Sequence, residues 1–305
     1  MPERVRITDV SPRDGLQNEP GVIPSADKVR LVELLSGTGV DEVEVSSFVS
    51  PRWVPQLGDA AEVFAAAGRS KPAGIVYSAL VPNEKGMEAA LEVNRKAAAR
   101  VIDKVSVFTA ASETFSHKNT NAGIAETIKR FEPVAALAKD NGLLLRGYIS
   151  CVIACPFEGR IEPGRVAQVA QALLDLGCDE IDLGDTIGAG EPETITFLIH
   201  ALLARFGDDV LSRSTLHLHD TFGKAAECVR EALQLGIRSF DGSVAGLGGC
   251  PYASTPGRRA PGNIATELLV STIEAGGYET GMDTTKLGEA RAFAASIVAR
   301  ARTRP

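Results

Sequence analysis

Short runs of apolar and β-branched residues alternate with longer amphipathic segments from one end of the chain to the other. This order is typical of a parallel sheet that is built from successive strand–helix units. The pattern predicts eight strands, at residues 5–10, 42–46, 74–79, 101–108, 143–149, 180–183, 215–219 and 238–242. It also predicts eight helices, at residues 25–38, 58–68, 84–98, 122–141, 163–176, 192–206, 223–236 and 263–276.

The first of these helices shows the local signals on which the assignments depend. Its apolar residues repeat on one face, as expected of a helix that covers a sheet. Ser25 is placed to cap the first turn, and Gly37 and Gly39 are expected to end the helix.

Eight strand–helix units in about 280 residues favour a (β/α)8 TIM barrel over an open doubly wound sheet. The Gly-rich nucleotide fingerprint that often follows the first strand of an open sheet is absent. No Gly/Ser-rich or Pro-rich linker divides the chain, so we expect one domain over residues 1–305, with the barrel at about 5–277. A further helix at about 283–300 is expected to pack on the barrel or on a partner chain.

Composition and charge narrow the classes of function. With 44% hydrophobic and 23% charged residues, the chain has the composition of an ordinary globular protein. A net charge of −7 without a Lys/Arg-rich run argues against a nucleic-acid partner. No apolar stretch reaches the ~18 residues of a membrane span, and no signal or transit peptide precedes the first strand. We therefore expect a cytoplasmic protein without a membrane partner.

Chemically active side chains collect where the predicted strands end, which is where barrel enzymes carry their catalytic groups. These positions hold Arg13, Asp14, Glu44, Asp185, His217, His219 and Cys250.

His217 and His219 are two apart on one strand, so they point to the same face and can offer two imidazoles to one ion. Hydrogen-bonded histidines inside the barrel are an equally good interpretation of this pair. Asp14 is either an oxygen ligand for Mg²⁺ or Mn²⁺ or a turn residue. Asn263 is either the N-cap of the last barrel helix or a further oxygen ligand.

Arg13 next to such an ion would stabilise negative charge on an enolate-like oxygen, although a surface ion pair is the default for an arginine. Alternation places Glu44 inside the barrel, where it is expected to pair with Arg13. Cys250 lies in a glycine-rich loop and is a candidate acid or base. The other four cysteines are expected to be buried and inert, and the absence of C-x-x-C spacing argues against structural zinc and disulfides.

Together these features resemble the 3-hydroxy-3-methylglutaryl-CoA lyases, metal-dependent TIM barrels of the pyruvate-carboxyltransferase-like group. The resemblance runs from about Val5 to Leu287. Its motifs are Ser11-Pro12-Arg13-Asp14-Gly15-Leu16-Gln17-Asn18-Glu19, the stretch 47–56, Arg146-Gly147-Tyr148 through Gly159, Gly184-Asp185-Thr186-Ile187-Gly188 and the loop 246–253. The first and last motifs are specific to the lyases, whereas the Arg-Asp and His-x-His elements are shared with synthases and aldolases.

The resemblance implies cleavage of an acyl-CoA substrate into acetyl-CoA and acetoacetate by a retro-Claisen reaction, in a homodimer or higher homo-oligomer. It implies that a divalent metal, Mg²⁺ or Mn²⁺, is bound by Asp14, His217, His219 and Asn263. It also implies that Arg13 binds the thioester oxygen and that Cys250 acts as acid and base. Glu44 and Glu267 would support these groups, and Asp185 would line the site. Gln17 and Ser150 would contact the substrate.

One departure is that the link 253–262 is longer and more basic than is usual in the family. Arg258 or Arg259 in the extension 254–260 either contacts a CoA phosphate or shields the site. Three alternatives stay open: a lyase for a longer 3-hydroxy-3-alkylglutaryl-CoA, an aldolase or acyl-CoA synthase of the same group, and a non-catalytic barrel that senses metal or acyl-CoA.

Overall fold

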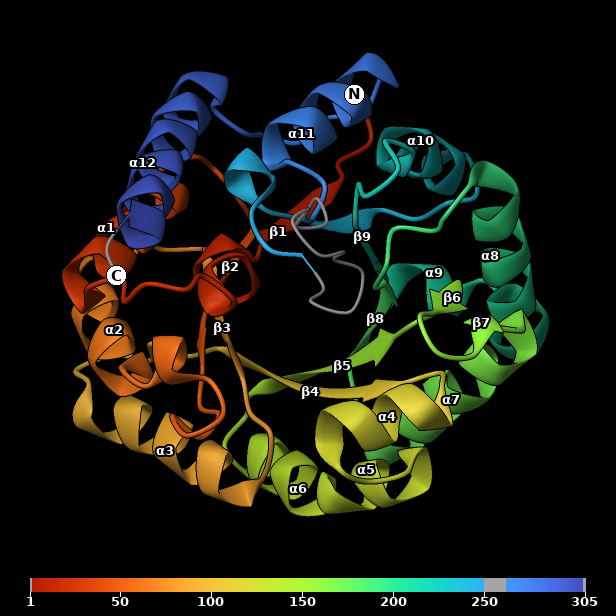
Figure 1. Cartoon of the computed structure of the whole chain (residues 1–305), viewed down its shortest axis with the longest axis horizontal. Coiled ribbons are helices and arrows are strands. Elements are labelled where there is room, and N and C mark those ends of the chain that lie inside the picture. The colour runs from red at the N-terminus through yellow and green to blue at the C-terminus, as the bar shows by residue number, and fades with distance from the viewer. Residues whose placement is uncertain (1, 250–261, 304–305) are drawn as a thin grey trace.

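In the computed structural model, which describes residues 2–249 and 262–303, eight parallel strands close into a barrel in the order β1-β10-β9-β8-β5-β4-β3-β2 (Figure 1). The strands are β1 (Arg6–Asp9), β2 (Glu42–Ser47), β3 (Val76–Leu80), β4 (Lys104–Ala110), β5 (Leu144–Ser150), β8 (Glu180–Asp185), β9 (Ser214–Leu218) and β10 (Ser239–Gly242). The predicted TIM barrel is confirmed, with strand ends displaced by a few residues.

Helices surround the barrel on its outside (Figure 1). They are α1 (Ser25–Ser36), α2 (Ala60–Ala67), α3 (Glu84–Lys96), α4 (Glu113–Thr120), α5 (Ile124–Arg130), α6 (Glu132–Asp140), α7 (Pro163–Leu176), α8 (Pro192–Phe206), α9 (Asp209–Ser212), α10 (Ala225–Gln234), α11 (Thr266–Ala275) and α12 (Thr284–Thr303). A short antiparallel hairpin, β6 (Ala154–Cys155) with β7 (Gly159–Arg160), follows β5. None of the helices in the described part of the chain is long and apolar enough to cross a membrane.

Three local predictions are corrected. The helix expected at 122–141 is two helices, because Pro133 at the start of α6 lacks the N–H that a continuous helix needs. No helix was predicted between residues 98 and 122, whereas α4 forms there, and the Ser112 side chain caps it by accepting from the Phe115 N–H. Ser25 does not cap α1, because Pro24 occupies the N-cap position and the Ser25 hydroxyl donates to Asp59 instead.

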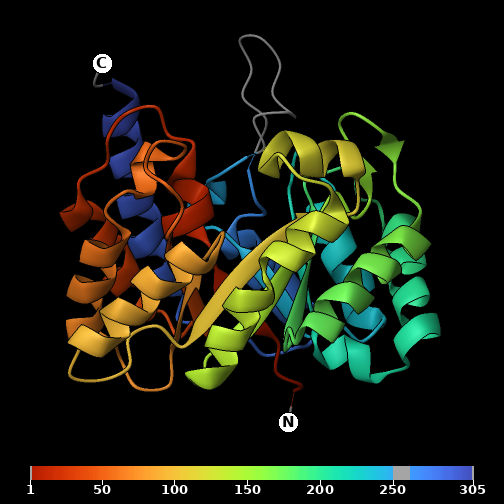
Figure 2. The same cartoon turned by 90° about the horizontal axis from the view of Figure 1, so that it is seen from below.

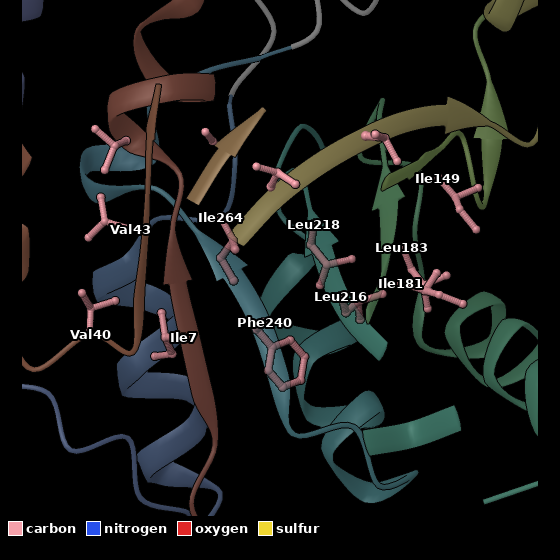
Figure 3. Packing of buried hydrophobic residues seen from close by; sticks show 14 of the residues in the cluster. Ile7, Val40, Val43, Ile149, Ile181, Leu183, Leu216, Leu218, Phe240 and Ile264 are labelled. Carbon is pink, nitrogen blue, oxygen red and sulfur yellow. The ribbon is translucent and has the colours of Figure 1, made fainter. Parts of the chain in front are cut away.

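The apolar core lies between the strands and the helices rather than inside the barrel. Figure 3 draws 14 of its side chains, and the labelled ones include Ile7, Ile181, Leu216, Leu218 and Phe240, all of which are buried. These residues alternate along their strands with polar ones, and alternation sends the two sets to opposite faces of a strand. The outer face of the sheet is therefore apolar, and its inner face is polar.

The centre of the barrel is filled by the side chain of Arg146, a fully buried residue of β5. Its guanidinium donates to Thr8 of β1 and pairs with Glu180 at 2.6 Å, Asp182 at 3.4 Å and Asp241 at 3.1 Å. A buried guanidinium is tolerated only where carboxylates neutralise it, so this network cross-links four strands through the barrel interior.

The network continues toward the N-terminal end of the barrel through Lys104, the first residue of β4. Its ammonium group donates to Glu42 and, at 2.7 Å, to Glu180, which also pairs with Arg146. Burial acts to raise the pKa of Glu180, but the charges of Arg146 and Lys104 and the hydrogen bonds from Lys104 and Thr215 hold that pKa at about 2. The carboxylate therefore stays charged between its two cations.

Helix α12, the expected C-terminal helix, packs beside α1 (Figure 1). Its last turns contact the loop that leads from β1 to α1, where Arg302 pairs with Glu19 at 2.8 Å. Gly21 of this loop lies against the Ala301 carbonyl so closely that a Cβ at position 21 would be 2.0 Å from that oxygen. The C-terminal helix thus fixes the first loop at the C-terminal end of the barrel.

Replacing Arg146 by Ala is expected to lower the free energy of unfolding by about 3–5 kcal/mol, because buried carboxylates are left without their partner. Urea unfolding measures the effect. Arg95→Ala is the matched control, since Arg95 pairs with Glu92 on the exposed surface of α3 and its loss should have little effect. Equal losses of stability in the two variants would contradict the assigned importance of the interior network.

Candidate active site

The predicted site residues come from elements that end at the same mouth of the barrel. Arg13 and Asp14 lie in a π-helical turn, η1 (Ser11–Gly15), which follows β1 after Val10 and has Pro12 as its second residue. Single π-turns are rare and are frequent at functional sites. His217 lies on β9 and His219 directly follows it, so that the turn and the strand present a carboxylate and two imidazoles to one another.

Asp14, His217 and His219 each offer one ligand atom, and these three atoms lie within 4.8 Å of one another. Asn263 joins them because its backbone forms an antiparallel bridge with His219 and its amide donates to Asp14 at 2.8 Å. The N-cap of α11 is Ala265, so the interpretation of Asn263 as the cap of this helix was wrong. The four residues inferred to bind metal therefore form one cluster.

Two buried atoms of this cluster have no hydrogen-bond partner among the described residues: Nδ1 of His219 and Oδ1 of Asn263. Buried polar atoms are nearly always satisfied, so a pair of orphaned acceptors beside a carboxylate calls for an explanation. Nitrogen and oxygen atoms of this kind suit a divalent cation. The donor set fits a metal ion.

The backbone of residue 248 lies directly on the cluster. Gly248 has φ of 105°, and a Cβ there would lie 2.6 Å from the Asn263 amide nitrogen and 3.0 Å from Asp14 Oδ2. Only glycine combines this left-handed backbone with such a close approach to the candidate ligands.

The charges and burial around the cluster keep Asp14 and His219 in the protonation states that bind a cation. Burial acts to raise the pKa of Asp14, but Arg13, both histidines and the Asn263 amide outweigh it and hold that pKa below its usual value. Burial and the neighbouring His217 lower the pKa of His219 to about 4. At neutral pH Asp14 is therefore anionic and His219 is neutral, the forms that metals bind.

Arg13 is buried beside the cluster and is held from two sides. Its Nε pairs with Glu44 at 2.5 Å, which confirms the expected pair, and its Nη1 pairs with Asp14 at 2.8 Å. Glu44 is itself fixed by the Ser106 hydroxyl at 3.2 Å. Although burial opposes the charge, Glu44 and Asp14 keep the pKa of Arg13 above its usual value. The site thus contains a permanent cation in a fixed orientation.

Asp185 and Glu267 lie at the edge of the site and bind backbone groups. Asp185, the last residue of β8, accepts from the N–H groups of Ala189 at 3.0 Å and Gly190 at 2.7 Å. Burial nevertheless raises the pKa of Asp185 to about 6. Glu267 in the first turn of α11 accepts from the N–H of Ala245, a residue in the left-handed region with φ of 58°. Both carboxylates organise loops next to the cluster.

The remaining predicted residues are placed less closely. Gln17 is half-buried two residues after the end of η1, and Ser150 is half-buried at the C-terminal end of β5. Cys250, Arg258 and Arg259 lie outside the described residues. The other four cysteines are buried, as expected.

Two residues that the sequence reasoning did not assign to the site lie within it or support it. The ring of Tyr148 lies between the guanidinium groups of Arg13 and Arg146, at 5.5 and 5.7 Å from its centroid, and meets His217 edge-on. Asp9 accepts from Ser11 in the first loop and from Thr266 of α11. The signal for Tyr148 was present, since Arg146, Tyr148 and Ser150 alternate on one strand.

The HMGL-like family model matches residues 4–294 of this chain. The chain is 45% identical over 293 residues to the mitochondrial hydroxymethylglutaryl-CoA lyase of Bos taurus, a match that covers 96% of this chain and 85% of that protein. It is 47% identical over 283 residues to a 3-hydroxy-3-isohexenylglutaryl-CoA/hydroxymethylglutaryl-CoA lyase of Pseudomonas aeruginosa, covering 93% of this chain and 89% of that one.

Solved structures of HMG-CoA lyases also match this chain over most of its length. The HMG-CoA lyase of Brucella melitensis superposes with a TM-score of 0.89 at 44% identity, covering 97% of this chain and 99% of that chain. An HMG-CoA lyase from Acinetobacter baumannii, solved in complex with coenzyme A and 3-methylmalate, superposes with a TM-score of 0.87 at 33% identity, covering 97% and 92%.

The buried, neutral His219 predicts a pH-dependent stability of the metal-free protein. Its folded pKa of about 4 lies below the unfolded value of 6.5, so its contribution is complete above pH 6.5 and is lost as the pH falls toward 4. Between pH 7 and pH 5 the wild type should lose roughly 2 kcal/mol more unfolding free energy than His219→Gln. Urea unfolding at both pH values measures this difference, and parallel losses in the two proteins would refute it.

Proposed function

Because this chain belongs to the HMGL-like family, we propose that it is a carbon–carbon lyase that cleaves 3-hydroxy-3-methylglutaryl-CoA into acetyl-CoA and acetoacetate. The observation that carries the proposal is the convergence of Asp14, His217 and His219 within 4.8 Å, next to the buried Arg13. A cation site beside a fixed guanidinium suits the cleavage of a hydroxylated acyl thioester, in which negative charge develops on oxygen.

We infer that Asp14, His217, His219 and Asn263 would hold a divalent ion, Mg²⁺ or Mn²⁺. Carboxylate and amide oxygens favour these hard cations, and imidazoles are compatible with Mn²⁺. When bound, such an ion acts as a Lewis acid that eases loss of the proton from the substrate 3-hydroxyl.

Bond cleavage then follows from the position of Arg13. The oxygen left by the hydroxyl proton becomes the keto oxygen of acetoacetate, the C2–C3 bond breaks, and its electron pair passes to the acetyl-CoA fragment as an enolate. Arg13 stabilises the enolate oxygen without moving, because Glu44 and Asp14 already fix the guanidinium. Cys250, as acid and base, takes up the hydroxyl proton in its thiolate form and then donates a proton to the enolate carbon, which becomes the methyl group of acetyl-CoA.

Other residues support this chemistry in the proposal. Glu267 and Asp185 hold the loops at the edge of the site, while Gln17 and Ser150 contact the acyl group. Arg258 or Arg259 contacts a CoA phosphate or shields the site. We further propose that the enzyme works in the cytoplasm as a homodimer or higher homo-oligomer.

A second candidate substrate is a longer 3-hydroxy-3-alkylglutaryl-CoA. The specific reason is the 47% identity to the Pseudomonas aeruginosa protein, whose name includes both an isohexenyl and a methyl substrate. The two substrates differ only in the 3-alkyl group, so the same metal ligands, Arg13 and thiol serve both reactions.

A lyase assay with product identification tests the proposal. Purified protein with Mg²⁺ or Mn²⁺ is expected to release acetyl-CoA and acetoacetate from 3-hydroxy-3-methylglutaryl-CoA, and chelation should abolish the release until metal is restored. The isohexenyl analogue in the same assay establishes the chain-length preference. Full turnover by the metal-free enzyme would defeat the mechanism, and failure to cleave either thioester would defeat the function.

Cys250→Ala is expected to lower kcat by roughly 10²-fold or more if the thiol transfers the proton, while substrate binding persists. Cys178→Ala is the matched control, because burial raises the pKa of that thiol to about 12 and it precedes the N-terminal end of β8, away from the mouth. Wild-type kcat in both variants would assign the proton transfer to another group.

A further inference from the structure

Two buried carboxylates lie next to His217 on the side of the barrel interior. Asp241 of β10 approaches Nδ1 of His217 at 3.1 Å through Oδ2. A ligand atom of Asp182 on β8 also lies within 4.8 Å of His217 and Asp241. Both carboxylates are fully buried and pair with Arg146, but neither has a part in the chemistry proposed above.

This second group of acidic residues is poorly suited to hold another ion. The guanidinium of Arg146 already pairs with Asp241 at 3.1 Å and with Asp182 at 3.4 Å, so a cation is present there. Burial and the neighbouring Asp241 raise the pKa of Asp182 well above its usual value.

The contact with Asp241 selects one form of the His217 ring. A neutral imidazole carries its proton on one nitrogen only, and a carboxylate partner favours the proton on the nitrogen that faces it. In the neutral ring, this contact favours the proton on Nδ1 and leaves the lone pair on Nε2. Tyr148 meets the ring edge-on, with centroids 6.2 Å apart and an interplanar angle of 89°, and so limits its rotation.

Asp241 cannot readily move away from this position. Both of its oxygens accept from Nη1 of Arg146, at 3.1 and 3.3 Å, and Arg146 is fixed in turn by Glu180 and Thr8. The orientation of His217 is thus determined by a chain of buried contacts that begins at the centre of the barrel.

We propose that Asp241 is a positioning residue that holds His217 with its Nδ1–H toward the barrel interior and its Nε2 lone pair available for the metal. The inference rests on the metal site proposed above. The buried network around Arg146 would then contribute to metal binding as well as to the stability of the barrel.

The tautomer of His217 tests the geometry without any metal. The chain has four histidines, so ¹⁵N-labelled histidine gives few signals, and His217→Gln assigns the one of interest. Long-range ¹H–¹⁵N correlation of the metal-free wild type is expected to show the Nδ1–H form. Observation of the Nε2–H form would overturn the proposal whatever the variants do.

Manganese affinity tests the consequence. Asp241→Asn should weaken Mn²⁺ binding, measured by electron paramagnetic resonance of free Mn²⁺, by about 10- to 100-fold. Asp182→Asn is the matched control, because Asp182 pairs with Arg146 in the same network as Asp241 but makes no hydrogen bond to His217 among the described residues. Its Mn²⁺ affinity should stay close to that of the wild type.

An equal loss of Mn²⁺ affinity in both variants would overturn the proposal, because the loss would then come from the charge network as a whole. Unchanged Mn²⁺ affinity in both variants would overturn it as well. Thermal unfolding of the metal-free variants verifies that each is folded. Failure of the wild type to bind Mn²⁺ would refute the metal site itself, whereas the tautomer experiment would still decide the contact between Asp241 and His217.

Discussion

The buried guanidinium of Arg146 is the group around which the inside of this barrel is built. Charge in such a place is unfavourable unless several carboxylates surround it, and Glu180, Asp182 and Asp241 do so from two different strands. TIM barrels usually fill their interior with layers of branched apolar side chains. Here most of the buried apolar side chains pack between the strands and the helices, and the interior is held by ionic contacts around Arg146.

The two faces of each strand therefore contribute differently to the protein. The outer face buries apolar surface and stabilises the fold, whereas the inner face sets the directions of the polar groups at the mouth. A slip of one residue in any strand would exchange the two sets, so the register is strongly specified. The interior network reaches the site twice, through Asp241 at His217 and through Tyr148, which lies between Arg146 and Arg13.

The sequence predicted the barrel well, because alternation and amphipathic periodicity are local properties. It also predicted the pairing of Arg13 with Glu44, since an inward carboxylate needs a partner. It missed α4, whose residues are mostly polar, and it joined α5 to α6 despite Pro133. The place of Asn263 against His219 and the contact of Glu267 with Ala245 depend on segments that meet only after folding, and no local pattern reveals them.

The docking of α12 has a practical meaning for handling the protein. The described chain begins at the end of the barrel opposite the mouth, while α12 ends near the mouth (Figure 2). Arg302 is tied to Glu19 in the loop that follows the candidate ligand Asp14. Tags, fluorophores or surface linkages belong at the amino end, because a group attached behind α12 would start beside the loop that follows Asp14.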